Sequence, residues 1–243
     1  MGPIPARRLG HFYSAFLQIW TQDASAQIAG EEGLLYRWLF PPTLWRAGEH
    51  IPVSYNLQLP PDLAPGAYRL VTGVYIAHFT DRRLTTAPDD WPIDDAATIG
   101  WLKVPLPPTD VPADALAFDA TIDDAFALRA GSACAVRDTS LEITLYWQAL
   151  TDRPRIDATI FIHALAGDGT LLTGTDARPL DGQYPTFIWD AGEIVRTTHT
   201  LDASGAAALA AGMYTFPGSA RLPVMQNGSE SAMMTVDLSA LLD

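Results

Sequence analysis

Residues 184–193 read Tyr-Pro-Thr-Phe-Ile-Trp-Asp-Ala-Gly-Glu, and residues 40–49 read Phe-Pro-Pro-Thr-Leu-Trp-Arg-Ala-Gly-Glu. The two stretches align without a gap, tryptophan on tryptophan and Ala-Gly-Glu on Ala-Gly-Glu. Residues 13–19 match residues 158–164 in the same order, and the alignment places Tyr68 on Tyr214. The repeat is longer than the period of about 20 to 50 residues that is typical of solenoids and propellers. It therefore predicts two tandem domains of one fold.

Strand patterns dominate both copies. Residues Ile51–Leu59 alternate apolar and polar side chains, as a half-buried strand does, and Leu141–Trp147 is rich in β-branched and aromatic residues. The alanine-rich stretch 203–211 aligns with the proline-rich loop 60–66, so we expect one or two short turns there. Closely spaced strands without a βαβ rhythm predict an all-β fold of two tandem antiparallel β-sandwiches, immunoglobulin-like or jelly-roll-like.

The predicted boundaries follow the prolines between the copies. Residues 1–106 form the first repeat, residues 107–114 a stiff Pro-rich linker, and residues 115–243 the second repeat.

The second copy is longer at its front than the first. It carries Leu141–Trp147 and residues 118–136 before the strand at Phe161, whereas Met1 lies shortly before the strand at Phe16. We therefore expect the first domain to lack its N-terminal strands. Another protein chain, or a missing upstream segment of the same chain, would then complete it, because open sheet edges are rarely left uncovered. A first domain that has diverged to a smaller sheet is the alternative.

Composition limits the class of protein. The 243 residues carry a net charge of −13, with 48% hydrophobic and 10% aromatic residues, which indicates a globular chain and disfavours nucleic-acid binding. The single Cys134 excludes an internal disulfide and a multi-cysteine metal site. The apolar stretch after Arg7-Arg8 is broken by polar residues, so neither a signal peptide nor direct membrane insertion is expected.

Two Trp–Glu pairs are the candidate ligand-binding residues: Trp45 with Glu49, and Trp189 with Glu193. Carboxylates beside an aromatic platform suit a sugar, and a glycosidase needs two such carboxyl groups. The alternative is structural, because Trp-x-Ala-Gly-Glu also reads as a strand end followed by a tight turn that glycine allows. No catalytic residue, metal ligand or cofactor is predicted, since neither a nucleophile elbow nor a phosphate loop or dinucleotide fingerprint is present.

For the other polar residues that could carry chemistry, a structural role is the favoured interpretation. His163 lies on a predicted strand where the first copy has Gln18, so a catalytic or metal role competes with an ordinary core or surface histidine. Three acidic residues could contribute to a calcium site but match no known loop, which favours scattered surface acids: Asp168, Asp176 and Asp181. Cys134 reads as a small core residue, and Asn227-Gly228 reads as a turn.

The second copy resembles a known module through a series of motifs: residues 145–150, 160–163, 168–169, Asp176, 179–186, Trp189, 192–193 and 221–224. It is similar to the extracytoplasmic module found, often in tandem, after the membrane region of bacterial glycosyltransferase-like proteins related to lipid-linked-mannose mannosyltransferases. The resemblance covers residues 115–243 well and 13–105 more weakly. After Tyr214 the repeat alignment loses several residues, which predicts a shorter last hairpin in the second copy. The resemblance implies an accessory role without catalytic residues.

These observations predict a non-enzymatic accessory pair of β-sandwiches on the extracytoplasmic face of a bacterial membrane or on the cell surface, with glycan as the candidate ligand. The alternative is an assembly subunit that docks a partner strand on the open edge of the first domain. A glycoside hydrolase-like enzyme is the third interpretation.

Overall fold

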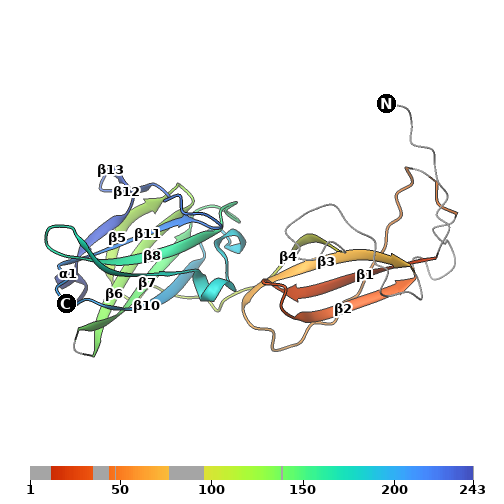
Figure 1. The fold of residues 1–243 in the computed structure, drawn as a ribbon, viewed down its shortest axis with the longest axis horizontal. Helices are drawn as coiled ribbons and strands as arrows, with labels where there is room; N and C mark the ends of the chain where they lie inside the picture. Colours follow the sequence, from red (N-terminus) through yellow and green to blue (C-terminus); the bar gives the residue numbers. More distant parts are fainter. Residues whose placement is uncertain (1–11, 35–43, 47, 77–95, 138, 243) are drawn as a thin grey trace. The chain divides into compact units, whose positions relative to one another are not determined.

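The structure is a computed structural model that describes residues 12–34, 44–46, 48–76, 96–137 and 139–242 (Figure 1). The prediction of an all-β protein is confirmed, because three antiparallel sheets account for the fold, with one short α-helix, α1 (Leu238–Leu242), in the described ranges. The chain divides into two compact units, Met1–Val104 and Pro105–Asp243. The finer boundaries at 106 and 114 stay a prediction. No helix in the described part is long and apolar enough to cross a membrane.

The first unit holds one four-stranded sheet in the order β2-β1-β3-β4 (Figure 1). Its strands are β1 (Tyr13–Thr21), β2 (Gln27–Leu34), β3 (Gly66–Ile76) and β4 (Ala97–Val104). A small core of buried residues lies on it: Phe16, Val71, Tyr75 and Ala96.

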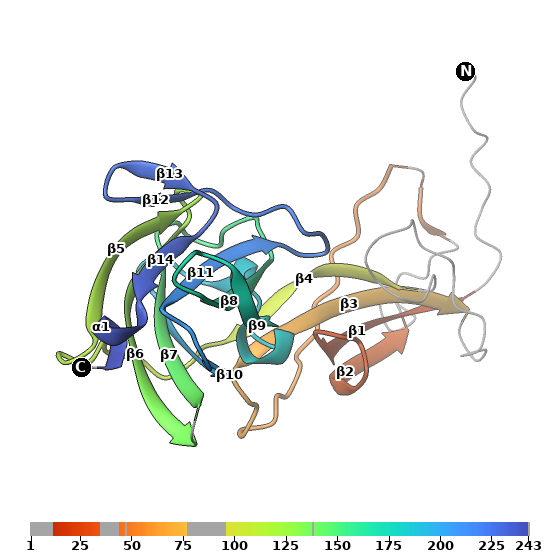
Figure 2. The same cartoon turned by 60° about the vertical axis from the view of Figure 1, so that its left-hand side comes forward.

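The second unit holds two sheets, of six and four strands (Figure 2). The six-stranded sheet has the order β10-β7-β6-β5-β12-β13, and the four-stranded sheet has the order β14-β11-β8-β9. The strands of the first are β5 (Leu116–Ile122), β6 (Phe126–Arg137), β7 (Ser140–Ala149), β10 (Ile194–Asp202), β12 (Val224–Gln226) and β13 (Ser229–Ser231). Those of the second are β8 (Ala158–Leu165), β9 (Leu171–Ala177), β11 (Ala208–Thr215) and β14 (Met234–Asp237).

Burial follows the sequence pattern in the second unit. Along β10 every second residue is buried, so that Val195, Thr197, His199 and Leu201 lie in the core. The strand paired with it, β7, is buried almost throughout. Between β9 and β10 the chain forms two short 3-10 turns, η3 (Pro179–Gly182) and η4 (Thr186–Ile188).

The sheet of the first unit repeats the four-stranded sheet of the second. Read from β9, that sheet has the order β9-β8-β11-β14, which matches β2-β1-β3-β4 strand for strand. The registers also match, since Phe16 lies opposite Gly73 and Phe161 lies opposite Gly212. The repeat recognised in the sequence is therefore a repeat of sheet topology and of register.

One detail of the sequence alignment is wrong. Tyr68 pairs with Thr21 at one end of β1, whereas Tyr214 pairs with Thr159 near the start of β8. The residue equivalent to Tyr214 is Tyr75, which pairs with Ser14. Matching the Gly-x-Tyr sequences of the two copies aligned Tyr68, and not Tyr75, with Tyr214. The Phe–Gly pairs, which set the register, give the correct alignment.

The alanine-rich stretch 203–211 forms the predicted short turn only in its first half, where the N–H of Ala206 donates to the carbonyl oxygen of Ala203 at 2.9 Å. From Ala208 onward it belongs to strand β11, where Ala210 and Ala211 are buried. Small side chains such as alanine fit here because β11 is a central strand of its sheet and its residues are closely packed. The last connection of the second copy is shorter than that of the first, as predicted, but by two residues only: 18 residues separate Thr215 from Met234, and 20 separate Ile76 from Ala97.

The prediction of a strand over Ile51–Leu59 is also wrong. Residues 51–60 have no regular secondary structure, and within the described part of the chain no strand pairs with them. Their counterpart in the second copy is β10, which pairs with β7 along its whole length. A strand pattern forms a strand only when a neighbour takes its backbone hydrogen bonds.

Candidate functional site

The Trp-x-Ala-Gly-Glu motif of the second copy forms a closed turn. The backbone N–H of Glu193 donates to the carbonyl oxygen of Asp190 at 2.9 Å, and the N–H of Asp190 donates to Oε2 of Glu193 at 2.9 Å. Gly192 has φ of 84°, in the left-handed region that favours glycine. The glutamate side chain therefore caps its own turn.

The first copy builds the same turn. The N–H of Glu49 donates to the carbonyl oxygen of Arg46 at 3.1 Å, the N–H of Arg46 donates to Oε2 of Glu49 at 2.9 Å, and Gly48 has φ of 83°. The structural interpretation of the motif as a tight turn accounts for glycine and glutamate in both copies.

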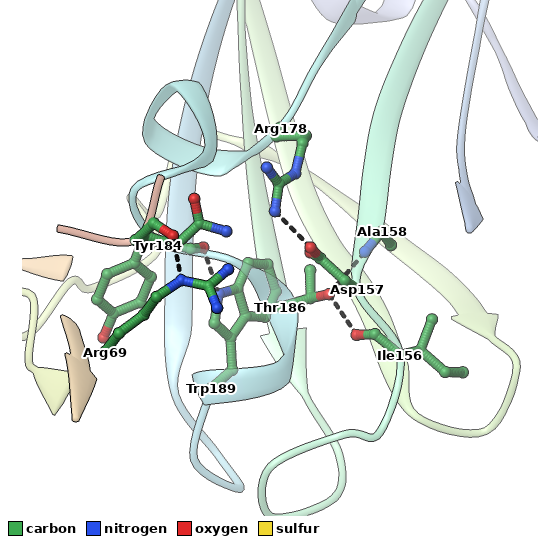
Figure 3. Close-up of polar contacts among 9 residues, drawn as sticks. Arg69, Ile156, Asp157, Ala158, Arg178, Tyr184, Thr186 and Trp189 are labelled. Atoms are coloured by element: carbon green, nitrogen blue, oxygen red, sulfur yellow. Dashed lines mark hydrogen bonds and ion pairs between the residues drawn. The ribbon is translucent and has the colours of Figure 1, made fainter. Parts of the chain in front are cut away.

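Trp189 belongs to the core of the second unit (Figure 3). It is 0% exposed, its Nε1 donates to the carbonyl oxygen of Tyr184 at 3.2 Å, and Phe126 packs edge-on at 5.7 Å between ring centroids. The hydroxyl of Tyr184, also buried, donates to Oε1 of Glu193. Glu193 thus holds the turn with one oxygen and a core tyrosine with the other.

The equivalent residues of the first copy are more accessible. Trp45 is half-buried and Glu49 is exposed. Ligand binding by Trp45, Glu49, Trp189 and Glu193 stays a prediction, but the buried ring of Trp189 offers no open face for stacking on a sugar.

His163 lies in a polar and aromatic cluster on one face of the four-stranded sheet. Its Nε2 is 3.7 Å from Oδ1 of Asp176, and the hydroxyl of Tyr214 donates to Oδ2 of that aspartate at 3.3 Å. The guanidinium of Arg221 lies over the ring of Phe161 at 4.2 Å from its centroid. Burial lowers the pKa of His163 from its ordinary 6.5, and Arg221 lowers it further, against the opposing effect of Asp176. Burial and Arg221 thus favour the neutral form of this imidazole, and Asp176 opposes them.

The remaining candidates from the sequence are dispersed. Asp168 caps the β8–β9 hairpin by accepting the N–H of Thr170 at 2.9 Å, which confirms the turn predicted there. Cys134 is exposed near the end of the β6–β7 hairpin, so its interpretation as a core residue is wrong. Within the described ranges, no three His, Cys, Asp or Glu side chains lie together in a way that could hold a metal ion.

No motif in the sequence indicates the ion pair between Arg178 and Asp157, whose side chains are mostly buried (Figure 3). The two side chains are 17% and 15% exposed, and Nη2 of Arg178 donates to Oδ2 of Asp157. Next to the pair, Thr186 donates to the carbonyl of Ile156 at 2.6 Å and accepts the N–H of Ala158 at 2.9 Å. Burial raises the pKa of Asp157 although Arg178 opposes that effect. The pair ties the loop before β10 to the start of β8.

The segment Ile51–Leu59 is the place where the two copies differ most. Val53 is 42% exposed and Leu59 is 43% exposed, although both are apolar. The backbone N–H of Asn56 donates to Oε2 of Glu31 at 2.7 Å, which places the segment beside β2. Burial, Glu31 and Tyr75 together raise the pKa of Tyr55. The segment thus lies beside its sheet and has no regular secondary structure.

One face of the first sheet is also incompletely covered. In the second unit the face of the four-stranded sheet that carries Ile162, Leu209 and Met213 is buried, at 0%, 2% and 0% exposure. The equivalent residues of the first unit, fixed by the shared register, are only half-buried: Leu17, Leu70 and Val74. This half-buried apolar face of the first unit is the candidate functional site.

Comparison with known proteins does not assign this chain to a family. No protein-family model matches this chain, and no curated protein matches it.

Proposed function

We propose that this chain is a non-enzymatic accessory protein whose first unit assembles with a partner by accepting β-structure. The single observation that carries the proposal is that Leu17, Leu70 and Val74 on the first sheet are only half-buried, whereas their counterparts Ile162, Leu209 and Met213 are buried. Proteins seldom leave a strand pattern and its apolar face open, and addition of a strand from outside is a common way to cover them.

We infer that the second unit is a complete β-sandwich of its two sheets. The buried large side chains of both sheets support this inference, since Trp147 and Ile143 on β7 and Ile160 and Ile162 on β8 are all 0% exposed. The described part of the first unit corresponds to the four-stranded sheet. A sandwich needs a second layer, and the described part of residues 1–104 contains one sheet.

The assembly role accounts for more of the structure than the other two interpretations do. Glycan binding by the Trp–Glu motif needs an open aromatic face, which the buried Trp189 does not offer. A glycosidase needs a pair of free carboxyl groups, and Glu49 and Glu193 each bind the backbone of their own turn. The extracytoplasmic location rests on the resemblance of the motifs and remains part of the proposal.

Unequal stability of the two units tests this function. In a monomeric sample of the full chain, hydrogen exchange under increasing urea should show β1 and β3 opening at a lower free energy than β8 and β11, because Leu17, Leu70 and Val74 are less buried than their counterparts. Equal opening free energies for these equivalent strands would mean that the first unit is complete, and the assembly role would be lost.

A further inference from the structure

The polar cluster on the four-stranded sheet of the second unit is a site separate from the candidate site of the first unit. Four side chains form it: His163 on β8, Asp176 on β9, Tyr214 on β11 and Arg221 beyond the end of β11. We propose that this cluster binds a sugar residue through two neighbouring hydroxyl groups. The inference goes beyond the assembly role and does not depend on it.

The register of the sheet brings the four side chains to one face. Asp176 lies directly opposite Phe161, and Arg221 forms a β-bridge with Tyr214. His163 follows Phe161 by two residues along β8, so it lies on the same face of the strand. The hydroxyl of Tyr214 donates to Oδ2 of Asp176 at 3.3 Å, and the guanidinium of Arg221 lies 4.2 Å from the ring centroid of Phe161. Three strands and the chain after β11 thus contribute to one site.

Two glycines hold the rings of this face in place. A Cβ atom on Gly174 would come within 2.5 Å of Cδ2 of His163, and one on Gly212 would come within 2.6 Å of Cζ of Phe161. Each ring therefore lies over a glycine of a neighbouring strand. The rings of Phe161 and Tyr214 are nearly parallel, with 22° between their planes and 6.4 Å between their centroids. Side chains that are fixed before binding lose less conformational entropy when a ligand arrives.

The charged groups of the cluster are accessible to a ligand. The side chain of Asp176 is 48% exposed, and Arg221 is exposed as well. The hydrogen bond from Tyr214 to Asp176 is long at 3.3 Å, and Nε2 of His163 lies 3.7 Å from the carboxylate. A carboxylate can accept about four hydrogen bonds. Asp176 therefore keeps acceptor capacity on the side that faces solvent.

The balance of charge selects a neutral ligand. Asp176 repels an anion that Arg221 attracts, and Arg221 repels a cation that Asp176 attracts. Burial lowers the pKa of His163, which favours the uncharged imidazole. A hydroxyl group donates to a carboxylate and accepts from a guanidinium, so two adjacent hydroxyls can bind both groups. The ring of Tyr214 adds an apolar surface beside its polar tip. A sugar residue has adjacent hydroxyls and apolar C–H groups in one molecule.

The first unit repeats the chemistry of three of these positions. Phe16 lies opposite Glu32 as Phe161 lies opposite Asp176. The counterparts fixed by the register are a hydrogen-bonding side chain, a carboxylate and a tyrosine: Gln18, Glu32 and Tyr75. Strand pairing does not require an exposed carboxylate at this place on an edge strand. Its presence in both copies supports a role in binding.

Titration of the isotope-labelled full chain with simple sugars tests the inference. Methyl α-glucopyranoside, methyl α-galactopyranoside and methyl α-mannopyranoside are added separately up to about 50 mM, because an open site binds a single sugar weakly. Backbone amide signals are followed by NMR. At least one of the three sugars should shift the amides of β8, β9 and β11 around the cluster in a saturable way. Sodium sulfate and choline chloride, the ionic controls, should not.

Four variants make the test specific to the cluster. Asp176→Asn and Arg221→Gln each remove one charged partner of the sugar hydroxyls. The matched controls are Asp168→Asn in the β8–β9 turn and Arg196→Gln on β10. All four positions are exposed, so each variant should keep the parent's thermal unfolding midpoint. We expect the first two variants to weaken binding by at least about tenfold, as for hydrogen bonds to charged groups, and the controls to stay within a factor of about two.

Each other outcome overturns a stated part of the inference. Absence of a saturable shift with all three sugars would overturn the site. Sulfate shifts as large as those of the sugars would replace the sugar by an anion bound at Arg221. Equal losses in the control variants, or shifts confined to the turns that contain Trp45 and Trp189, would overturn the assignment to this cluster. None of these results changes the opening free energies of β1 and β3, so the assembly role is judged separately.

Discussion

Phe161 on β8 lies directly opposite Gly212 on β11, and a Cβ atom on Gly212 would come within 2.6 Å of Cζ of the phenylalanine ring. The ring therefore occupies the space that a side chain would take. The first copy places Phe16 opposite Gly73 in the same register. This pair marks the structural repeat better than any longer stretch of matching sequence does.

Gly212→Ala should destabilise the second unit. The added methyl group forces the buried ring of Phe161 to move, which costs about 1 to 3 kcal/mol in a well-packed site. Urea denaturation followed by tryptophan fluorescence measures this loss. The matched control is Gly167→Ala, where the new Cβ would meet only Ala207 at 4.0 Å, and its free energy of unfolding should stay within about 0.5 kcal/mol of the parent.

Glu193→Ala should cost more than Glu49→Ala. The first variant removes the acceptor of the buried Tyr184 hydroxyl as well as the cap of the turn, a loss of about 1 to 3 kcal/mol. Glu49 is exposed and caps a turn only, so its removal should cost less than about 1 kcal/mol. Chemical denaturation of both variants gives the comparison. Equal effects would contradict the structural role assigned to Glu193.

Arg178→Leu should be strongly destabilising because it leaves the Asp157 carboxyl buried without its ion-pair partner. Loss of one member of a buried pair costs about 3 to 5 kcal/mol. The double variant Arg178→Leu with Asp157→Leu should recover much of that loss, since it removes the unpaired charge. A single variant as stable as the parent would show that the pair contributes nothing to the attachment of the loop before β10.

The buried His199 should make the second unit sensitive to acid. Burial lowers its pKa in the folded protein, and its Nε2 lacks a hydrogen-bond partner within the described structure. The unfolded chain, with an ordinary pKa of 6.5, binds more protons. The free energy of unfolding is therefore fully retained above pH 6.5 and falls as the pH decreases below it. His163 acts in the same direction.

Replacing His199 with leucine removes the titrating group while keeping an apolar side chain beside Leu201. Urea denaturation at pH 7.5 and 5.5 should show a smaller loss of unfolding free energy on acidification in His199→Leu than in the parent. His163→Gln is the matched comparison, because Asp176 partly offsets the effect of burial there. An unchanged pH dependence in His199→Leu would rule out His199 as its source.

The all-β class and the tandem repeat could be predicted because strand alternation and the Trp-x-Ala-Gly-Glu turn are local patterns. The turn in particular depends on one glycine and one glutamate close together in sequence, Gly192 and Glu193 in the second copy. The correct alignment of β3 with β11 could not be predicted in this way. It is set by pairs such as Phe161 and Gly212, which are far apart in the chain.

The same limit applies to the candidate site. The alternation of Ile51–Leu59 indicates a strand, but whether a strand forms depends on a neighbour that local sequence does not specify. The ion pair of Arg178 and Asp157 could not be predicted from local sequence either. Neither residue belongs to a motif, and only the packing of the loop against β8 brings them together.

Hydrogen exchange of Ile51–Leu59 compared with Ile194–Asp202 tests the central claim most directly. The two segments follow equivalent turns and differ in that β10 has β7 as a neighbour. In a strictly monomeric sample of the full chain, the account predicts that the amides of Ile51–Leu59 are less protected than those of Ile194–Asp202 that bond to β7. Equal protection of the two segments would show that the first unit is already complete, and would contradict the account.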